Sequence, residues 1–248
     1  MAQAGFHGLI GLAGAAVRRD EQSPVAVSGA WKFGFVLGNL LPDADFFLLG
    51  PMFLVNSAAA RTLHRSFSHS FLTIGVLTMV LTWLARGRSD RRSLAFGLGL
   101  GMVLHSLVDI FVWFSGVNVL WPLGYLGVPS EINLWAMLPV PGVVSSLLGA
   151  VDYLAFALFF LYLGRLAKRL GTNGAFLPRL RFFGVLNLTV FVVYSALAFL
   201  LKPGLFEIAH YALFILAFFP ICLYVTVKMR PTIEKIGSPS AVRTTAAA

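Results

Sequence analysis

The chain contains a succession of long apolar runs, and these constrain its fold more than any other feature. Segments such as residues 93–114 and 182–201 approach the length of about 20 apolar residues that a helix needs to cross a bilayer. Of the 248 residues, 58% are hydrophobic and only 12% are charged, roughly half the charged fraction of a soluble domain. Because the runs are continuous rather than alternating, they predict an all-α, polytopic helical membrane protein instead of a β-barrel.

We expect about six to seven membrane segments, separated by polar or proline-rich stretches. The single cysteine, Cys222, lies inside the last segment, so neither a disulfide framework nor a thiolate metal site is expected. The apolar runs cover residues 4–17, 25–41, 70–85, 93–114, 147–164, 182–201 and 206–227.

The net charge of +9 is compatible with nucleic-acid binding, but the distribution of basic residues indicates membrane topology instead. If the stretch 86–92 is cytoplasmic, alternation of the segments puts fifteen of the 19 lysines and arginines on that side. Cytoplasmic loops of multi-pass proteins carry such an excess of basic residues. We therefore expect the N-terminus outside and the C-terminus in the cytoplasm, with no nucleic-acid partner.

Histidines and aspartates are concentrated in the first 109 residues, and the expected topology brings seven of them to a similar depth near the outer face. The second segment ends at Pro42, because proline disfavours a helical conformation at the residue before it. His105 lies roughly 18 Å along the fourth segment, at about 1.5 Å per residue. The residues that share this depth are His7, Asp43, Asp45, His64, His69, His105 and Asp109.

These seven residues have the chemistry of a metal site. His105 and Asp109 are four residues apart, so both project from one face of a helix. Ionisable groups within membrane helices are costly and indicate function by default. Imidazole and carboxylate ligands without thiolate suit zinc, manganese or iron, and seven potential ligands exceed what one tetrahedral zinc uses. The sequence therefore predicts one or two divalent metal ions near the outer face.

Each motif also has a structural explanation when it is taken alone. LPDAD at 41–45 is typical of a helix stop, and HRSFSHS at 64–70 could be a helix N-terminus. In that case Ser66 or Ser68 would be the cap, and Arg65 would reach lipid headgroups. These separate explanations do not account for the depth that the seven residues share.

Three further polar residues are interpreted as structural. His210 lies far from the other histidines in the sequence, and Asp152 and Glu207 fall near the outer ends of their segments. We expect the two acids to be interfacial and His210 to be no metal ligand.

The order of the motifs resembles the YdjM-like family, whose members are described as LexA-binding, inner-membrane-associated and membrane-bound metal-dependent hydrolases. That family's pattern reads approximately LPDxD, HRGxTHS, HxxxD and WP, after an early histidine. This chain differs from the pattern at two positions, with Ser66 in place of glycine and Ser68 in place of threonine. The resemblance covers about residues 1–125. It rests on His7 with Gly11, residues 41–45, residues 64–70, His105 with Asp109, and Trp121–Pro122.

The resemblance implies an inner-membrane metal-dependent hydrolase core at residues 1–125, with its site facing the outer side. Residues 126–228 would add further membrane helices, and residues 229–248 would form a disordered cytoplasmic tail. Because the family's description derives from likeness to zinc-dependent phospholipases C and single-strand nucleases, the implied reaction is hydrolysis of an ester, above all a phosphoester, in a lipid or lipid-linked substrate. Zinc is then the first expectation for the metal.

Among the seven potential ligands, Asp45 and His69 are expected to take part in catalysis, and Arg65 is expected to pair with a substrate phosphate. The loop 115–146, which is rich in tryptophan, tyrosine and proline, would lie over the site at the interface. No GxSxG or HExxH motif is present in the sequence, so a serine hydrolase of that kind or a zincin is not indicated.

Two alternatives remain open. A metal-ion carrier would use the same ligands along a transport path, although it needs access from both sides and the polar residues cluster near one face. A non-catalytic membrane subunit would instead hold a structural metal, with all coordination positions filled by protein. Membrane lipid is the expected partner, and the sequence indicates no particular protein partner.

The charge distribution gives a testable topology. A cysteine replacing Tyr125 should react with a membrane-impermeant maleimide added to intact cells, whereas one replacing Asp90 should react only after the membrane is permeabilised. The reverse labelling pattern would place the histidine-rich face in the cytoplasm and contradict the orientation.

Overall fold

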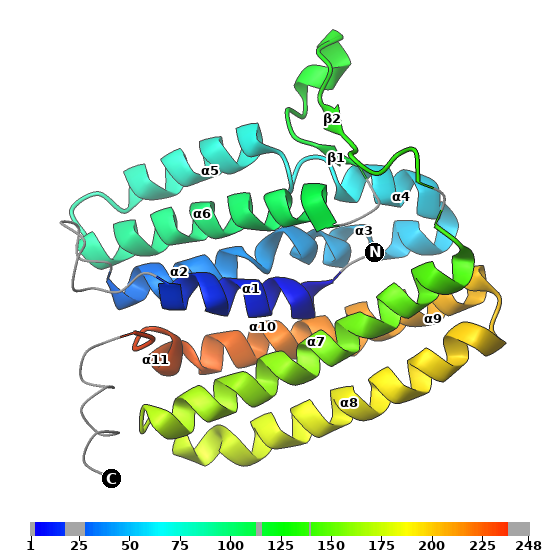
Figure 1. The fold of residues 1–248 in the computed structure, drawn as a ribbon. Coiled ribbons are helices and arrows are strands. Elements are labelled where there is room, and N and C mark those ends of the chain that lie inside the picture. The colour runs from blue at the N-terminus through cyan, green and yellow to red at the C-terminus, as the bar shows by residue number, and fades with distance from the viewer. Residues whose placement is uncertain (1–2, 18–27, 113–115, 139, 238–248) are drawn as a thin grey trace.

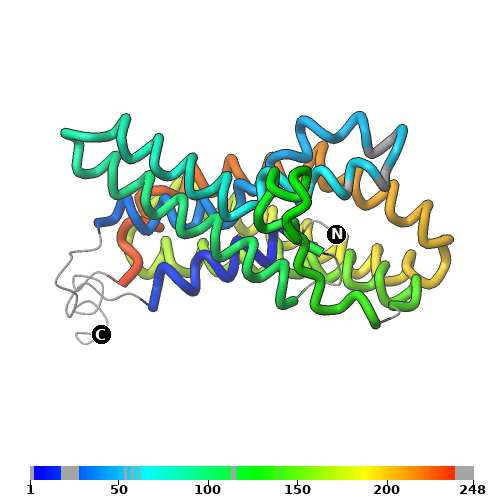
Figure 2. The backbone as a smooth tube through the Cα atoms, turned by 90° about the horizontal axis from the view of Figure 1, so that it is seen from above, coloured from blue at the N-terminus to red at the C-terminus, as the bar shows by residue number. Residues whose placement is uncertain are grey.

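The computed structural model describes residues 3–17, 28–112, 116–138 and 140–237, and this part of the chain is mostly helical (Figure 1). The main helices run along one common direction, so the molecule is an elongated bundle (Figure 2). The α-helices are α1 (Ala4–Val17), α2 (Gly29–Gly38), α3 (Phe46–Val55), α4 (Ser57–His64), α5 (Phe71–Leu84), α6 (Ser89–Val112), α7 (Gly142–Arg169), α8 (Leu177–Leu200), α9 (Pro203–Leu213), α10 (Phe219–Lys228) and α11 (Arg230–Ile233).

Short elements complete the fold. Two residues of β1 pair with two of β2 in an antiparallel hairpin, and a π-helical turn joins α9 to α10. These elements are η1 (Leu41–Asp45), β1 (Val117–Asn118), η2 (Leu123–Leu126), β2 (Glu131–Ile132), η3 (Gly174–Phe176) and η4 (Phe214–Phe218).

Each of the seven predicted apolar segments contains a helix, but the helices differ in length. Four stretches, 89–112, 142–169, 174–200 and 203–228, are long and apolar enough to cross a membrane. A fifth is obtained if α2 and the helical stretch after it are counted as one bent span. Helices α1 and α5 have only 14 residues each. The described chain therefore has four such helices, or five with the bent pair, and a total of six to seven spans remains a prediction.

The chain bends sharply where proline was expected to end the second segment. Helix α2 ends at Gly38, η1 begins at Leu41, and the axes before and after the break differ by 51°. Pro42 can occupy the first turn of a helical element because the amide hydrogen it lacks has no partner there in any case. The bend directs η1, with its two aspartates, into the interior of the bundle.

Helices α2 and α6 are in backbone contact along glycine-lined faces. A Cβ atom added at Gly38 would lie 2.1 Å from the carbonyl oxygen of Leu98, and one at Gly101 would lie 2.2 Å from that of Phe35. Small residues four apart allow this approach between membrane helices. The contact sets the position of His105 relative to η1.

Helix α7 packs against α1, α8 and α9. Phe156, Phe159 and Phe160 on α7 are fully buried. Helix α8, at the edge of the bundle (Figure 1), has only 17% of its apolar window buried inside the protein. Its outward-facing Val192 and Phe199 are more than half exposed, as expected for a helix surface that contacts lipid.

The hairpin between α6 and α7 is anchored on the HRSFSHS segment. The Asn118 amide donates to the Arg65 carbonyl at 2.8 Å, and the Phe71 amide donates to the Val119 carbonyl at 2.9 Å. Ser70 caps α5 by accepting from the Thr73 amide. The N-terminal cap is therefore Ser70, and neither of the two serines considered for that role, Ser66 and Ser68, provides it.

Residues after α10 pack against the bundle. Helix α11 lies next to α2, and Met229 and Ile233 are fully buried. This differs from the disordered tail expected from residue 229 onward, because two apolar side chains separated by one helical turn find a place in the core. Residues 238–248 lie outside the described part of the chain.

The glycine contact between α2 and α6 can be tested by stability. Gly38→Ala should lower the thermal unfolding midpoint of the detergent-solubilised protein, because the new methyl group overlaps backbone; overpacking of this kind costs about 1–3 kcal/mol. Gly75→Ala, at a helical glycine with no atom near its Cβ position, should leave the midpoint unchanged or raise it slightly. Equal midpoints for both variants would contradict the close contact.

Candidate metal centre

The structure brings the seven predicted histidines and aspartates into one buried cluster. His7 comes from the first turn of α1, and His105 and Asp109 come from the last turns of α6. No side chain of the set is more than 5% exposed as a residue. The others come from η1 (Asp43, Asp45), from the end of α4 (His64) and from the turn after it (His69).

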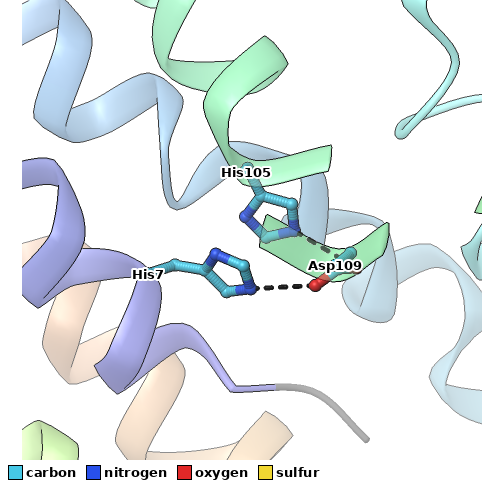
Figure 3. Close-up of side chains that lie close together, drawn as sticks. All are labelled: His7, His105 and Asp109. Carbon is cyan, nitrogen blue, oxygen red and sulfur yellow. Dashed lines mark hydrogen bonds and ion pairs between the residues drawn. The ribbon is translucent and has the colours of Figure 1, made fainter. Parts of the chain in front are cut away.

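One group of potential ligands joins α1 and α6 (Figure 3). His7 Nε2 lies 3.1 Å from Asp109 Oδ1, and His105 Nε2 lies 3.9 Å from Asp109 Oδ2. The two imidazole rings stack with their centroids 3.6 Å apart. The spacing of four residues between His105 and Asp109 places both on one helix face, as predicted, and His7 completes the group from the neighbouring helix.

A second group consists of Asp43, His64 and His69, whose ligand atoms all lie within 4.8 Å of one another. His64 Nε2 is 3.5 Å from Asp43 Oδ1. His105 Nε2 links the two groups, because it lies 3.7 Å from Asp43 Oδ1 and 3.1 Å from His69 Nε2. The two groups are therefore adjacent and could share ligands.

Three of the histidines are held by their Nδ1 atoms. His105 Nδ1 lies 2.8 Å from the Asn39 carbonyl oxygen, and His64 Nδ1 lies 2.6 Å from Asp45 Oδ1. His69 Nδ1 lies 2.8 Å from Ser68 Oγ, which itself donates its only proton to an oxygen acceptor. Donation from Nδ1 leaves the Nε2 lone pair of each ring free. This arrangement of outer partners is the usual one for metal-binding histidines.

The free lone pairs of the Nε2 atoms would attract a cation, whereas they repel one another. With both lone pairs free, the His69 and His105 Nε2 atoms face each other at 3.1 Å, which is repulsive unless a cation or proton lies near both. His64 Nε2 and Asp43 Oδ2 are buried without a hydrogen-bond partner. Metal–ligand bonds of about 2.0–2.1 Å place tetrahedral ligand atoms roughly 3.3 Å apart, close to the separations found. The cluster could hold a metal ion.

The charge of the buried carboxylates and the protonation of His64 also favour a bound metal ion. Three carboxylates are buried here, and Arg65 Nη1, at 3.7 Å from Asp109 Oδ2, supplies nearby positive charge. Burial lowers the pKa of His64 well below its usual range, and the neighbouring His69 and Arg65 lower it further. A neutral imidazole can donate its lone pair to a metal, whereas buried carboxylates need compensating positive charge.

Asp45 lies beside the two ligand groups rather than within either. Its Oδ1 accepts from His64, and its Oδ2 accepts from Ser68 Oγ at 2.6 Å. Both oxygens thus hold other side chains of the HRSFSHS segment. Ser68 keeps a hydroxyl at this position, and that hydroxyl is the donor to Asp45 Oδ2.

Sequence reasoning missed two residues that position the cluster. The Asn39 carbonyl becomes available because α2 ends one residue earlier, and no side-chain pattern reveals it. Asp152, expected to be interfacial, is fully buried, and its Oδ1 accepts from the Gly5 amide at 3.0 Å. It thereby anchors the start of α1, two residues before His7. The helix spacing on α7 alone could not indicate this partner, which is 147 residues away in the sequence.

His210 is not part of either ligand group found among the described residues. It is buried between aromatic rings, with the Tyr153 ring centroid 5.4 Å away. Glu207, one turn before it, is half-buried.

The fold and the site define a multi-pass helical membrane protein with a buried histidine–aspartate cluster that could hold a metal ion. The sequence model of the YdjM inner membrane protein family matches residues 1–202. The chain belongs to the YdjM inner membrane protein family, and the match extends beyond the residues on which the resemblance rested. No curated protein and no solved structure gives a significant match.

Metal content tests the cluster directly. Purified protein should retain near-stoichiometric transition metal, and His69→Ala and Asp109→Ala should each lower the metal-to-protein ratio, because each would lose a direct bond to the ion. His210→Ala, which removes a buried imidazole outside the cluster, serves as the matched control and should keep the metal. Equal metal content in all three variants, measured by plasma mass spectrometry, would reject the assignment.

Proposed function

We propose that this protein is a membrane-embedded metal-dependent hydrolase that cleaves an ester bond, above all a phosphoester, in a lipid or lipid-linked substrate. The convergence of three histidine Nε2 atoms, each held from behind through Nδ1, is the observation that carries the proposal. We assign one or two divalent ions, zinc first, to the two groups of ligands. The first comprises His7, His105 and Asp109, and the second comprises Asp43, His64 and His69.

The bound metal would supply a water of lowered pKa and positive charge for the substrate oxygens. The protein's own residues then have separate roles. His69 is held by Ser68 on one side and faces Asp109 Oδ2 at 3.3 Å on the other. Asp45 keeps His64 in the orientation that directs Nε2 inward, and it is the carboxylate placed to exchange a proton through Ser68.

Arg65 is suited to the substrate rather than to the metal. A guanidinium has no lone pair to donate and stays protonated. Its Nη1 lies 3.7 Å from Asp109, so the charge stands at the edge of the ligand cluster. There it would meet a phosphate oxygen whose negative charge increases in the transition state.

A cavity of about 480 Å³ lies beside the HRSFSHS segment and would accommodate a substrate of moderate size. It is lined by Ser66, next to Arg65, and by Trp121 and Tyr125 of the hairpin. The Trp121 Nε1 atom is buried without a hydrogen-bond partner and would donate to a ligand oxygen. Aromatic side chains at such a cavity match the headgroup depth of a bilayer. With the charge-derived topology, the substrate would come from the outer leaflet.

The proposal requires turnover that depends on metal. Detergent-purified protein should hydrolyse at least one member of a panel of phospholipids and lipid phosphates in mixed micelles, and a chelator should abolish the reaction. If metal-replete protein cleaves no member of a broad panel, the cluster is better explained as a structural or transport site.

Arg65→Ala should separate metal binding from turnover. The variant should keep its metal but lose at least about 100-fold in kcat, since removal of one charge-stabilising donor costs roughly 10²–10³. Arg86→Ala, which removes an exposed arginine on another turn, is the control and should retain full activity. Parallel loss of metal and activity in Arg65→Ala would instead assign Arg65 to holding Asp109 in place.

A further inference from the structure

A second cavity, of about 310 Å³, lies between the N-terminal ends of α7 and α9. This volume is at the lower end of the range for ligand pockets, about 300–1,000 Å³. Its α9 side lies beyond the residues matched by the family, and none of its lining residues belongs to the metal centre. The lining residues that offer polar side chains or helix-end amide groups to a ligand are Gly142, Ser145, Ser146, Gly204, Glu207 and His210.

Two helix N-termini meet at the mouth of this cavity. A Cβ atom at Gly142 would lie 2.6 Å from the Pro203 ring, so the two ends touch. Neither end has a side-chain cap or an acidic residue in its first turn. The first amide groups of a helix lack intrahelical partners and carry the positive end of the helix dipole. Lys202, exposed at the start of α9, adds positive charge, so the mouth favours an anion.

His210 on the cavity wall independently indicates a ligand. The residue is 2% exposed, and neither of its ring nitrogens has a hydrogen-bond partner. Buried polar groups are paired in the great majority of cases, and a neutral imidazole offers one N–H donor. The surrounding rings of Phe206 and Tyr153 pack against the imidazole but form no hydrogen bond with its nitrogens.

The two features lie at different depths. His210 is seven residues beyond Pro203, roughly 10 Å further along the helix at about 1.5 Å per residue. Side chains lean toward the helix N-terminus, which brings the imidazole back toward the mouth. A ligand that binds both the helix N-termini and His210 therefore carries an anionic group at the mouth. It also carries an oxygen acceptor deeper in the cavity, between apolar walls.

The membrane position of the cavity indicates what that ligand is. The stretches 142–169, 174–200 and 203–228 are each long enough to span a bilayer, and the start of α7, the end of α8 and the start of α9 meet at one end of the bundle (Figure 1). Where these stretches cross a bilayer, that end lies at the depth of the lipid headgroups. A phospholipid has its phosphate at this depth and its acyl ester carbonyls just beneath.

We propose that this cavity binds a phospholipid, with the phosphate at the amide groups of α7 and α9 and an ester carbonyl accepting from His210. Ser145 and Ser146 stand along the path between them. Glu207 also lines the cavity and makes an interaction within the protein; its acid favours a headgroup that carries an ammonium beside the phosphate. The site is separate from the metal centre and does not depend on the hydrolase proposal.

The test uses the full-length protein in detergent with a chelator present, so that metal-dependent turnover plays no part. Short-chain dihexanoyl phosphatidylethanolamine should raise the thermal unfolding midpoint by at least about 3 °C at saturation. Dihexanoylglycerol, which lacks the phosphate, should not. A shift of equal size with inorganic phosphate would identify free phosphate as the ligand and overturn the lipid assignment.

Two pairs of variants locate the binding. Gly204→Asp places a carboxylate at the mouth, where the Cβ position is open and an acid suits the helix N-terminus, so the fold should be retained while the lipid shift is lost. Gly204→Asn, of the same shape, should keep the shift. His210→Phe should weaken lipid binding and raise the apparent Kd at least about 10-fold. Asn187→Leu, which replaces a buried polar residue on α8, should leave the apparent Kd unchanged. An undiminished shift in Gly204→Asp overturns the proposal even if His210→Phe fails to fold.

Discussion

The burial of three carboxylates among four histidines is the constraint on which the rest of this structure depends. Asp43, Asp45 and Asp109 are almost completely removed from solvent, and a buried carboxylate is strongly disfavoured unless it is paired. Arg65 and the hydrogen bonds from His64 and Ser68 supply part of the compensation. The remaining ring nitrogens and carboxylate oxygens are arranged around the position that a divalent cation would take. Several elements contribute to the cluster: α1 and α6, η1, the end of α4 and the turn after it.

The helix packing serves this requirement. The backbone contact of α2 with α6 places the Asn39 carbonyl against His105, and the bend at Pro42 directs η1 toward the same ring. On the opposite side, Asp152 of α7 binds the first amide groups of α1 and so determines where His7 lies. Each of these contacts joins backbone to backbone or side chain to backbone. Such contacts limit small displacements of the helices, and a metal site needs its ligands held to within a fraction of an ångström.

Two polar cavities follow from this arrangement, and they differ in kind. The first cavity lies beside the HRSFSHS segment and the hairpin, and it is lined by Ser66 and Trp121. The cavity at His210 is lined by α7 and α9 and has uncapped helix ends in place of ligand side chains. The proposed hydrolysis is assigned to the metal centre and the proposed lipid binding to the cavity at His210, so a lipid bound at His210 would not be cleaved there. The two proposals therefore concern different chemistry at separate sites.

Much of the site could be predicted because its residues follow sequence patterns that depend only on the spacing of nearby residues. The apolar runs and the i, i+4 pair of His105 and Asp109 depend on periodicity alone, and the position of LPDAD and HRSFSHS at segment ends depends on proline and on alternation across a membrane. The family membership likewise follows from motif order. Other features depend on contacts between distant residues and have no local signal. These include the Nδ1 partners that orient three histidines, the anchoring of α1 by Asp152, the additional helices α3 and α4, and the unpartnered ring of His210 beside two helix ends. Periodicity specifies which face of a helix is polar, but only the packing of helices specifies which atom that face meets.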